Sequence, residues 1–274
     1  MISTPIRRYG AAILMLLTTA FSGGVLAKTH TDTTSKKAHV IKTTSSKVSS
    51  KQEYSRNSAK SSSLPDLRKY PSGTPRKKAF LRTVMPYITS QNAAITAERN
   101  WLISKQYQGQ WSPAERARLK DIAKRYKVKW SGNTRKIPWN TLLERVDIIP
   151  TSMVATMAAA ESGWGTSKLA RNNNNLFGMK CMKGRCTNAP GKVKGYSQFS
   201  SVKESVSAYV TNLNTHPAYS SFRKSRAQLR KADQEVTASA MIHKLKGYST
   251  KGNSYNNYLF AMYQDNQRLI AAHM

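Results

Sequence analysis

A helix that is apolar on every side is the sequence feature that most restricts the fold of this chain. Small or apolar residues fill nearly every position from Pro150 to Glu161, and Gly163 and Gly165 follow at once. A surface helix keeps a polar face, whereas a helix that is apolar all round is buried all round. We therefore expect a central helix here, ended by the glycines and enclosed by other elements.

The sequence on both sides of this segment predicts further helices. Apolar residues recur at helical spacing over residues 76–104, where Pro86 predicts a break or a kink. Ser112, Pro113 and Glu115 supply a cap, a first-turn proline and a capping-box acid for another helix. More helices are expected from about residue 138 and over residues 167–171, 200–213, 227–232, 236–246 and 255–273.

Residues 179–199 are the expected departure from helix. Their turn residues, together with Cys181 and Cys186, predict a small hairpin closed by a disulfide. The expected fold class is therefore α+β, mostly α. Two cysteines and five scattered histidines match no zinc-binding pattern, so we expect no metal and no cofactor.

The start of the chain carries features of export. Residues 1–27 are typical of a signal peptide, because Arg7 and Arg8 precede a short apolar run. That run is shorter than the ~20 apolar residues of a membrane span, so we expect no transmembrane anchor after cleavage. Residues 28–63 are basic and rich in serine and threonine, which predicts a disordered tether. We expect a helical lobe over residues 64–149 and a second domain over residues 150–274.

The charge of the chain indicates a polyanionic partner. There are 45 lysines and arginines against 13 aspartates and glutamates, a formal net charge of +32. A charge of this size favours binding to nucleic acid, anionic lipid or an acidic polymer. Because we expect export, we do not expect nucleic acid as the partner. The sequence carries no signal of an oligomeric state.

The 13 acids make the search for a catalytic carboxylate short. Glu204 follows Ser201 at capping-box spacing, which favours a structural role. Four others have a basic residue nearby on mixed-charge helical stretches and are expected on solvated faces. These four are Glu98, Asp121, Glu144 and Asp147.

Glu161 differs from the other acids because it ends the apolar helix. Burial and the negative end of the helix dipole both disfavour its anion, so we expect a raised pKa. A carboxyl that stays protonated near neutral pH is suited to act as the general acid in glycosidic cleavage. Gly163 and Gly165 are expected to turn the chain away and to leave room for a polymer.

Two motifs in this region resemble the signatures of a known family. The segment from Glu161 to Ala170, followed by residues 174–178, resembles the bacterial glucosaminidase domain of glycoside hydrolase family 73, whose members cleave peptidoglycan. The segment from Tyr248 to Tyr255 resembles the second signature of that family. The resemblance implies a lysozyme-like fold, in which a helical lobe and a small β-hairpin lobe flank a groove, and it implies that Glu161 is the general acid.

The same resemblance assigns further residues to the groove. It implies that Tyr248 and Tyr255 lie near the point of cleavage. Trp164, Asn175 and Phe177 match the first signature, and we expect Asn175 and Phe177 mainly to shape the groove floor. The implied partner is the peptidoglycan glycan strand, and the positive charge then favours retention on anionic cell-wall polymer.

A second catalytic carboxylate is missing from the place where many family members carry one. Residues 179–203 contain no aspartate or glutamate. Three hypotheses for the second catalytic group remain open: assistance by the N-acetyl group of the substrate, a water positioned by a tyrosine, or a distant acid that folds into the groove. The candidates for that acid are Glu204, Asp233 and Glu235.

The leading hypothesis is a periplasmic endo-β-N-acetylglucosaminidase that cuts the peptidoglycan strand after N-acetylglucosamine. A lytic transglycosylase is the nearest alternative, because it also works with a single glutamate. A wall-binding module without turnover is the non-enzymatic alternative. An amidase that cuts the peptide stem has less support, since the sequence lacks zinc ligands.

Overall fold

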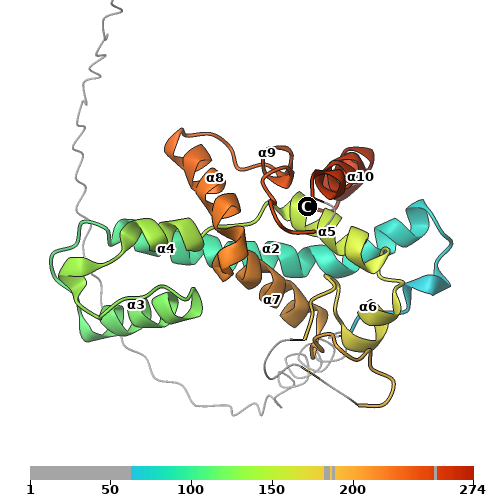
Figure 1. Ribbon diagram of the computed structural model, residues 1–274, viewed down its shortest axis with the longest axis horizontal. Helices are drawn as coiled ribbons and strands as arrows, with labels where there is room; N and C mark the ends of the chain where they lie inside the picture. The colour runs from blue at the N-terminus through green and yellow to red at the C-terminus, as the bar shows by residue number, and fades with distance from the viewer. Residues whose placement is uncertain (1–62, 182–185, 187–188, 250–251) are drawn as a thin grey trace, which may run out of the picture. The chain divides into compact units, whose positions relative to one another are not determined.

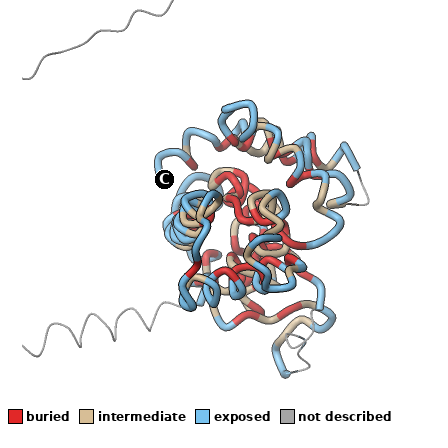
Figure 2. Tube along the Cα trace, turned by 90° about the vertical axis from the view of Figure 1, so that its left-hand side faces the viewer, coloured by how far each residue is buried: buried red, intermediate tan, exposed pale blue. Residues whose placement is uncertain are grey.

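The apolar segment forms α5 (Thr151–Ser162), and other helices enclose it (Figure 1). The computed structural model describes residues 63–181, 186, 189–249 and 252–274. The predicted signal peptide and almost all of the predicted tether lie outside these residues. All described residues belong to one unit, Val48–Met274. In Figure 2 the buried residues lie along the inner turns of the trace and the exposed residues along the outer ones.

The helices that pack most extensively on α5 are α2 (Thr74–Ser104), α9 (Ala238–Ile242) and α10 (Asn253–Ala271). From Met153 to Ala159 every residue of α5 is buried. Gly163 ends the helix in the left-handed conformation, with φ of 56°. The prediction of a central helix ended by glycine is therefore confirmed.

Helix α2 continues through Pro86, so of the predicted break or kink the break is excluded. A proline inside a helix removes one backbone hydrogen bond. Pro86 is itself exposed, but Met85 and Ile88 beside it are buried, and α2 packs against both α5 and α7 (Val202–Thr215). Burial along the inner face stabilises the helix across this position, since most helical stability in proteins comes from packing.

The remaining helices follow the predictions with altered bounds. Ser112 and Glu115 form the predicted capping box at the start of α3 (Pro113–Arg125). Helix α8 begins seven residues earlier than expected, and α9 covers only part of the helix predicted over residues 236–246. The other elements are α4 (Trp139–Arg145), α6 (Lys168–Asn173), α8 (Ser220–Lys231), and the 3-10 turns η1 (Leu67–Lys69), η2 (Thr134–Lys136) and η3 (Pro217–Tyr219).

The predicted β-hairpin lobe does not appear as strands in the described residues. Two isolated antiparallel bridges, Lys180 to Tyr196 and Cys186 to Ser197, are the β pairing found there. The Asn173 amide instead donates a hydrogen bond to Val193 O (3.1 Å), so a side chain supplies contacts that a strand ladder would otherwise make. The predicted disulfide between Cys181 and Cys186 is confirmed.

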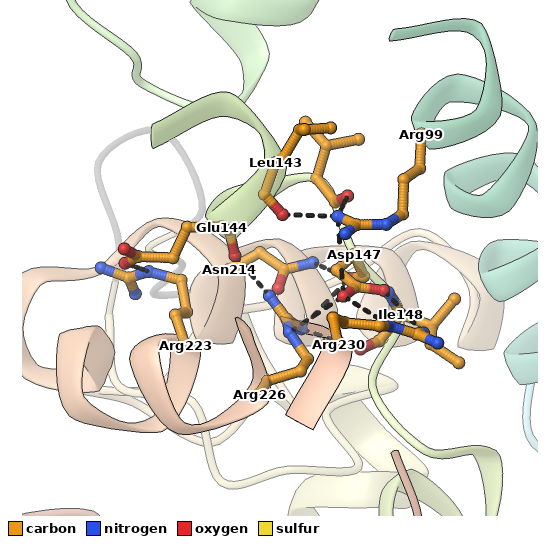
Figure 3. A network of polar contacts seen from close by, with 10 residues as sticks. Arg99, Leu143, Glu144, Asp147, Ile148, Asn214, Arg223, Arg226 and Arg230 are labelled. Atoms are coloured by element: carbon orange, nitrogen blue, oxygen red, sulfur yellow. Dashed lines mark hydrogen bonds and ion pairs between the residues drawn. The ribbon is translucent and has the colours of Figure 1, made fainter. Parts of the chain in front are cut away.

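Asp147 was expected on a solvated face, and that expectation is wrong. Its side chain is 1% exposed. Two arginines reach it from other helices: Arg230 of α8 binds both carboxylate oxygens at 3.0 and 3.1 Å, and Arg99 of α2 approaches within 3.6 Å. Figure 3 shows the carboxylate among these guanidinium groups. A buried carboxylate requires such pairing, because an isolated buried charge is strongly destabilising.

A third arginine joins α8 to the chain just before α5. Arg226 is fully buried and donates hydrogen bonds to the backbone oxygens of Asp147 (3.1 Å), Ile148 (2.8 Å) and Glu144 (2.8 Å). These oxygens lie at the end of α4 and in the connection to α5 (Figure 3). The arginine cluster therefore helps to determine where α5, and with it Glu161, lies.

Candidate active site

A cavity of about 560 Å³ opens beside the last turn of α5. Its walls come from segments that are far apart in the sequence. They include the ends of α5 and α7, the segment after α6, the loop before α10, the first turn of α10, and the second residue after the end of α3. The lining residues are Lys127, Glu161, Phe177, Gly178, Met179, Lys180, Cys181, Tyr209, Asn212, His216, Tyr219, Tyr248, Ser249 and Tyr255.

The Glu161 carboxyl group lies in the wall of this cavity. The Tyr255 hydroxyl donates a hydrogen bond to its Oε1 atom. Burial raises the pKa of Glu161 above its ordinary value, while hydrogen bonds from Tyr255 and Tyr248 act in the opposite direction. The net shift is upward, which is the direction expected from the position of Glu161 at the end of a buried helix.

Gly178 allows the backbone to pass close to the carboxyl group of Glu161, the candidate general acid. Its φ is +62°, and a Cβ atom on it would lie 3.5 Å from Glu161 Oε2. The glycine thus keeps that oxygen open. Gly165 has a different role from the one expected, because a Cβ there would lie 2.6 Å from Leu67 and 3.1 Å from Phe80. Gly165 therefore makes room for the protein core and not for a polymer.

The tyrosines around Glu161 are neutral hydrogen-bond donors. Burial is the main cause that raises the pKa of Tyr248 and of Tyr255 far above their ordinary value of 10, and the nearby Glu161 acts in the same direction. The Tyr209 hydroxyl lies 3.3 Å from that of Tyr248 and 2.9 Å from the Met157 sulfur. These phenols therefore keep their protons across the neutral range.

Five aromatic rings follow one another past Glu161. The ring centroids lie 6.2 Å apart from Tyr258 to Tyr255 and 5.5 Å apart from Tyr255 to Tyr248. The next separations are 6.1 Å from Tyr248 to Tyr219 and 5.8 Å from Tyr219 to His216. Tyr258, at one end of this aromatic row, is 53% exposed. The row gives the site a continuous series of faces, each with a polar atom at its edge.

Sequence reasoning missed several of these residues. Tyr209, Tyr219 and His216 line the cavity, although none of them was assigned to the site from the sequence. One signal was present, because His216 and Tyr219 lie in the connection between α7 and α8, and binding residues are found disproportionately on connecting segments. Lys127 lies far from both motifs, so no local pattern indicated its place in the site.

The predicted groove residues of the first motif divide into three environments. Phe177 lines the cavity and stacks on Tyr209 with a centroid distance of 3.9 Å. Asn175 is buried and is not among the lining residues; its side-chain amide exchanges hydrogen bonds with the backbone of Met179 and donates one to the backbone oxygen of Ser197. Trp164 is not among the lining residues and packs edge-on against Phe80.

None of the three candidate second acids lines the cavity. Glu204 accepts hydrogen bonds from the Ser200 backbone (2.7 Å) and hydroxyl (2.8 Å) at the start of α7. Asp233 and Glu235 are exposed after the end of α8. Among the described lining residues, Glu161 is the single carboxylate.

The sequence of the chain matches a known class of proteins. Residues 138–268 match the family model of the glucosaminidase domain, which is described as mannosyl-glycoprotein endo-beta-N-acetylglucosaminidase. The chain belongs to this glucosaminidase family. Over 274 residues it is 93% identical to protein Bax of Escherichia coli (strain K12), with 100% of both chains covered. No solved structure matches the chain. None of the described helices is long and apolar enough to cross a membrane.

Proposed function

We propose that the chain is an exported glycoside hydrolase that cleaves the peptidoglycan strand after N-acetylglucosamine, with Glu161 as the general acid. The observation that carries this proposal is the half-buried Glu161 carboxyl in the cavity wall, with a raised pKa and a hydrogen bond from Tyr255. The glucosaminidase family of residues 138–268 supports the same reaction class.

In the proposed reaction Glu161 donates its proton to the glycosidic oxygen as the bond to the anomeric carbon breaks. A raised pKa keeps the proton on Glu161 until the leaving group needs it. The carboxylate that remains accepts hydrogen bonds from Tyr255 and Tyr248, which stay neutral. These donors stabilise the anion as it forms, so they assist the proton transfer.

The second catalytic function is proposed to come from the substrate or from water. A retaining enzyme places its nucleophilic carboxylate about 5 Å from the acid, and an inverting one places its base about 6.5–9.5 Å away. No carboxylate besides Glu161 belongs to the described lining of the cavity. Attack by the N-acetyl oxygen of the sugar, or by a water held by a neutral tyrosine, requires no second carboxylate.

Binding of the strand is proposed to use the aromatic row and the charge of the protein. Sugar rings present apolar faces and hydroxyl edges, which fit aromatic rings that carry polar atoms. The predicted signal peptide would direct the chain to the periplasm. There the formal net charge of +32 favours retention on anionic wall polymer.

The single carboxylate also supports a second candidate, a lytic transglycosylase. In that reaction the 6-hydroxyl of the muramyl sugar attacks in place of water, so the products differ. A digest of purified sacculi with mass spectrometry of the fragments distinguishes the two. Reducing N-acetylglucosamine ends support the hydrolase, anhydro-muramyl ends support the transglycosylase, and sedimentation with sacculi without soluble fragments supports a wall-binding module.

The matched variants for this digest are Glu161→Gln and Asp265→Asn. Both remove one negative charge at constant side-chain size, but Asp265 is exposed on α10 and does not line the cavity. We expect fragment release to be lost in Glu161→Gln and kept in Asp265→Asn. Full release by a correctly folded Glu161→Gln protein would contradict the proposal.

A further inference from the structure

We propose that Lys127 and Lys180 make the cavity selective for glycan strands that carry carboxylates, so that peptide-bearing strands are preferred over neutral N-acetylglucosamine oligomers. This inference rests on the proposed function. It goes further by naming the part of the substrate that the two lysines recognise, the carboxylates. Lys127 precedes the family segment 138–268, whereas Lys180 lies within it. A part of the chain outside the glucosaminidase domain thus contributes to the cavity wall.

The corner that carries Lys127 is held by its neighbours. At the end of α3 the Val128 N–H donates to Ala123 O at 2.8 Å. Arg145 donates to the backbone oxygens of Tyr126 (3.0 Å) and Lys127 (2.7 Å). Tyr126 and Val128 are both buried, while Lys127 between them is exposed and lines the cavity. The side chain therefore extends from a fixed backbone.

The backbone at Lys127 has a conformation that favours glycine. Its φ is +54°, in the left-handed region that L-residues seldom adopt. Helices often end with glycine in this conformation, because glycine has no Cβ atom to clash. A lysine at such a position brings local strain, and strained residues are concentrated at functional sites. The left-handed backbone belongs to the end of α3, and a lysine in place of glycine there is consistent with a use of its side chain in the cavity.

Lys180 is oriented by an aromatic neighbour. Its ammonium group donates to the Tyr196 hydroxyl at 2.9 Å and lies 4.2 Å from the ring centroid. No acidic side chain among the described residues pairs with Lys127 or Lys180. Both ammonium groups are thus available to an anion, although each is partly solvated.

The charges of the cavity match a peptide-bearing strand. The described lining residues include two lysines and a single carboxyl, Glu161, which must be protonated to act as a general acid. Peptide stems and the lactyl groups that carry them bring carboxylates to the muramyl sugars, whereas N-acetylglucosamine oligomers have none. Opposite charges then favour the peptide-bearing strand through binding.

The experiment compares kcat/KM for soluble peptide-bearing glycan strands and for a neutral N-acetylglucosamine hexamer. The variants are Lys127→Gly, Lys127→Gln, Lys180→Gln and the double glutamine variant, with Lys129→Gln as control. Lys129 is exposed two residues along and does not line the cavity. Lys127→Gly relieves the backbone strain, so its thermal midpoint should equal or exceed that of the parent protein.

We expect each cavity lysine to contribute about a two- to five-fold preference for the peptide-bearing strand, within the range of solvated charge pairs. The change should appear in KM and not in kcat, and the preference should shrink as salt is added. If the hexamer is not cleaved, the variants are compared with the parent protein by their KM for the peptide-bearing strand. Unchanged KM and preference in the folded Lys127→Gly and double variants would overturn this inference alone. Cleavage of neither substrate by the parent protein would overturn the proposed function.

Discussion

The Tyr255 hydroxyl donates a hydrogen bond to the Glu161 carboxyl group across 94 positions of sequence. The bond joins the first turn of α10 to the last turn of α5, and these two helices pack against each other. The contact therefore connects the packing of the core to the protonation of the proposed general acid.

Replacing Glu161 with glutamine should lower kcat by about 10²- to 10⁴-fold, the contribution typical of a general acid. Glutamine keeps the size of the side chain but has no proton of suitable acidity. Release of soluble fragments from sacculi measures the loss. The Asp265→Asn protein should retain its rate, and a similar loss in that control would show that the effect is not specific to the site.

Tyr255→Phe should move the alkaline limb of the pH profile to higher pH. The hydrogen bond from Tyr255 lowers the pKa of Glu161, so its removal raises that pKa further. Glu161 then stays protonated at higher pH, although the absolute rate falls because the carboxyl is less well oriented. The profile of kcat/KM against pH measures the limb, and a shift to lower pH would contradict the assigned direction.

The difference in unfolding free energy between Glu161→Gln and the parent protein should grow as pH rises. The ordinary pKa of 4.5 applies to the unfolded chain, and burial raises the pKa in the folded protein. Between those two values the unfolded chain has lost a proton that the folded protein keeps, so the parent loses stability with rising pH. Glutamine does not titrate. Thermal unfolding at several pH values measures the difference, and a constant difference would exclude the raised pKa.

Gly165→Ala and Gly178→Ala should have contrasting effects. At Gly165 the new methyl group meets the Leu67 side chain, and overpacking of this kind costs about 1–3 kcal/mol in addition to the strain of positive φ. At Gly178 the methyl group lies in ordinary contact with Glu161 Oε2, at 3.5 Å, so we expect a clear loss of activity and a smaller loss of stability. Denaturant unfolding measures the loss of stability, and digestion of sacculi measures the loss of activity.

Asp147→Asn should destabilise the protein by about 3–5 kcal/mol, because it takes the anion away from the fully buried Arg226 and the largely buried Arg99. Arg230, Arg99 and Arg226 all lie within 4 Å of the Asp147 carboxylate. The matched control is Asp121→Asn, whose pair with Arg125 is exposed and is worth about 0–1 kcal/mol. If Asp147→Asn and Asp121→Asn lowered the free energy of unfolding in urea by the same amount, the buried network would not be the main source of the stability.

Local patterns were sufficient for elements whose determinants lie close together in the sequence. The capping box of α3 and the glycine end of α5 each depend on residues at most a few positions apart. The apolar character of α5 was also enough to predict its burial. The two motifs identified the family and directed attention to Glu161, whose raised pKa follows from the end of a buried helix.

The tertiary structure decided everything that depends on segments distant in sequence. Asp147 is buried and not solvated because α8 brings Arg230 to it from 83 positions away. Residues 179–199 lack strands in their described part, since asparagine side chains from the end of α6 and just after it bind this backbone. Lys127 reaches the cavity only through the packing of the corner after α3. The sequence by itself determined which helices form and which carboxyl is unusual, because these properties depend on neighbouring residues. Burial, charge pairing and the cavity wall depend on which helices meet, and only the folded chain decides that.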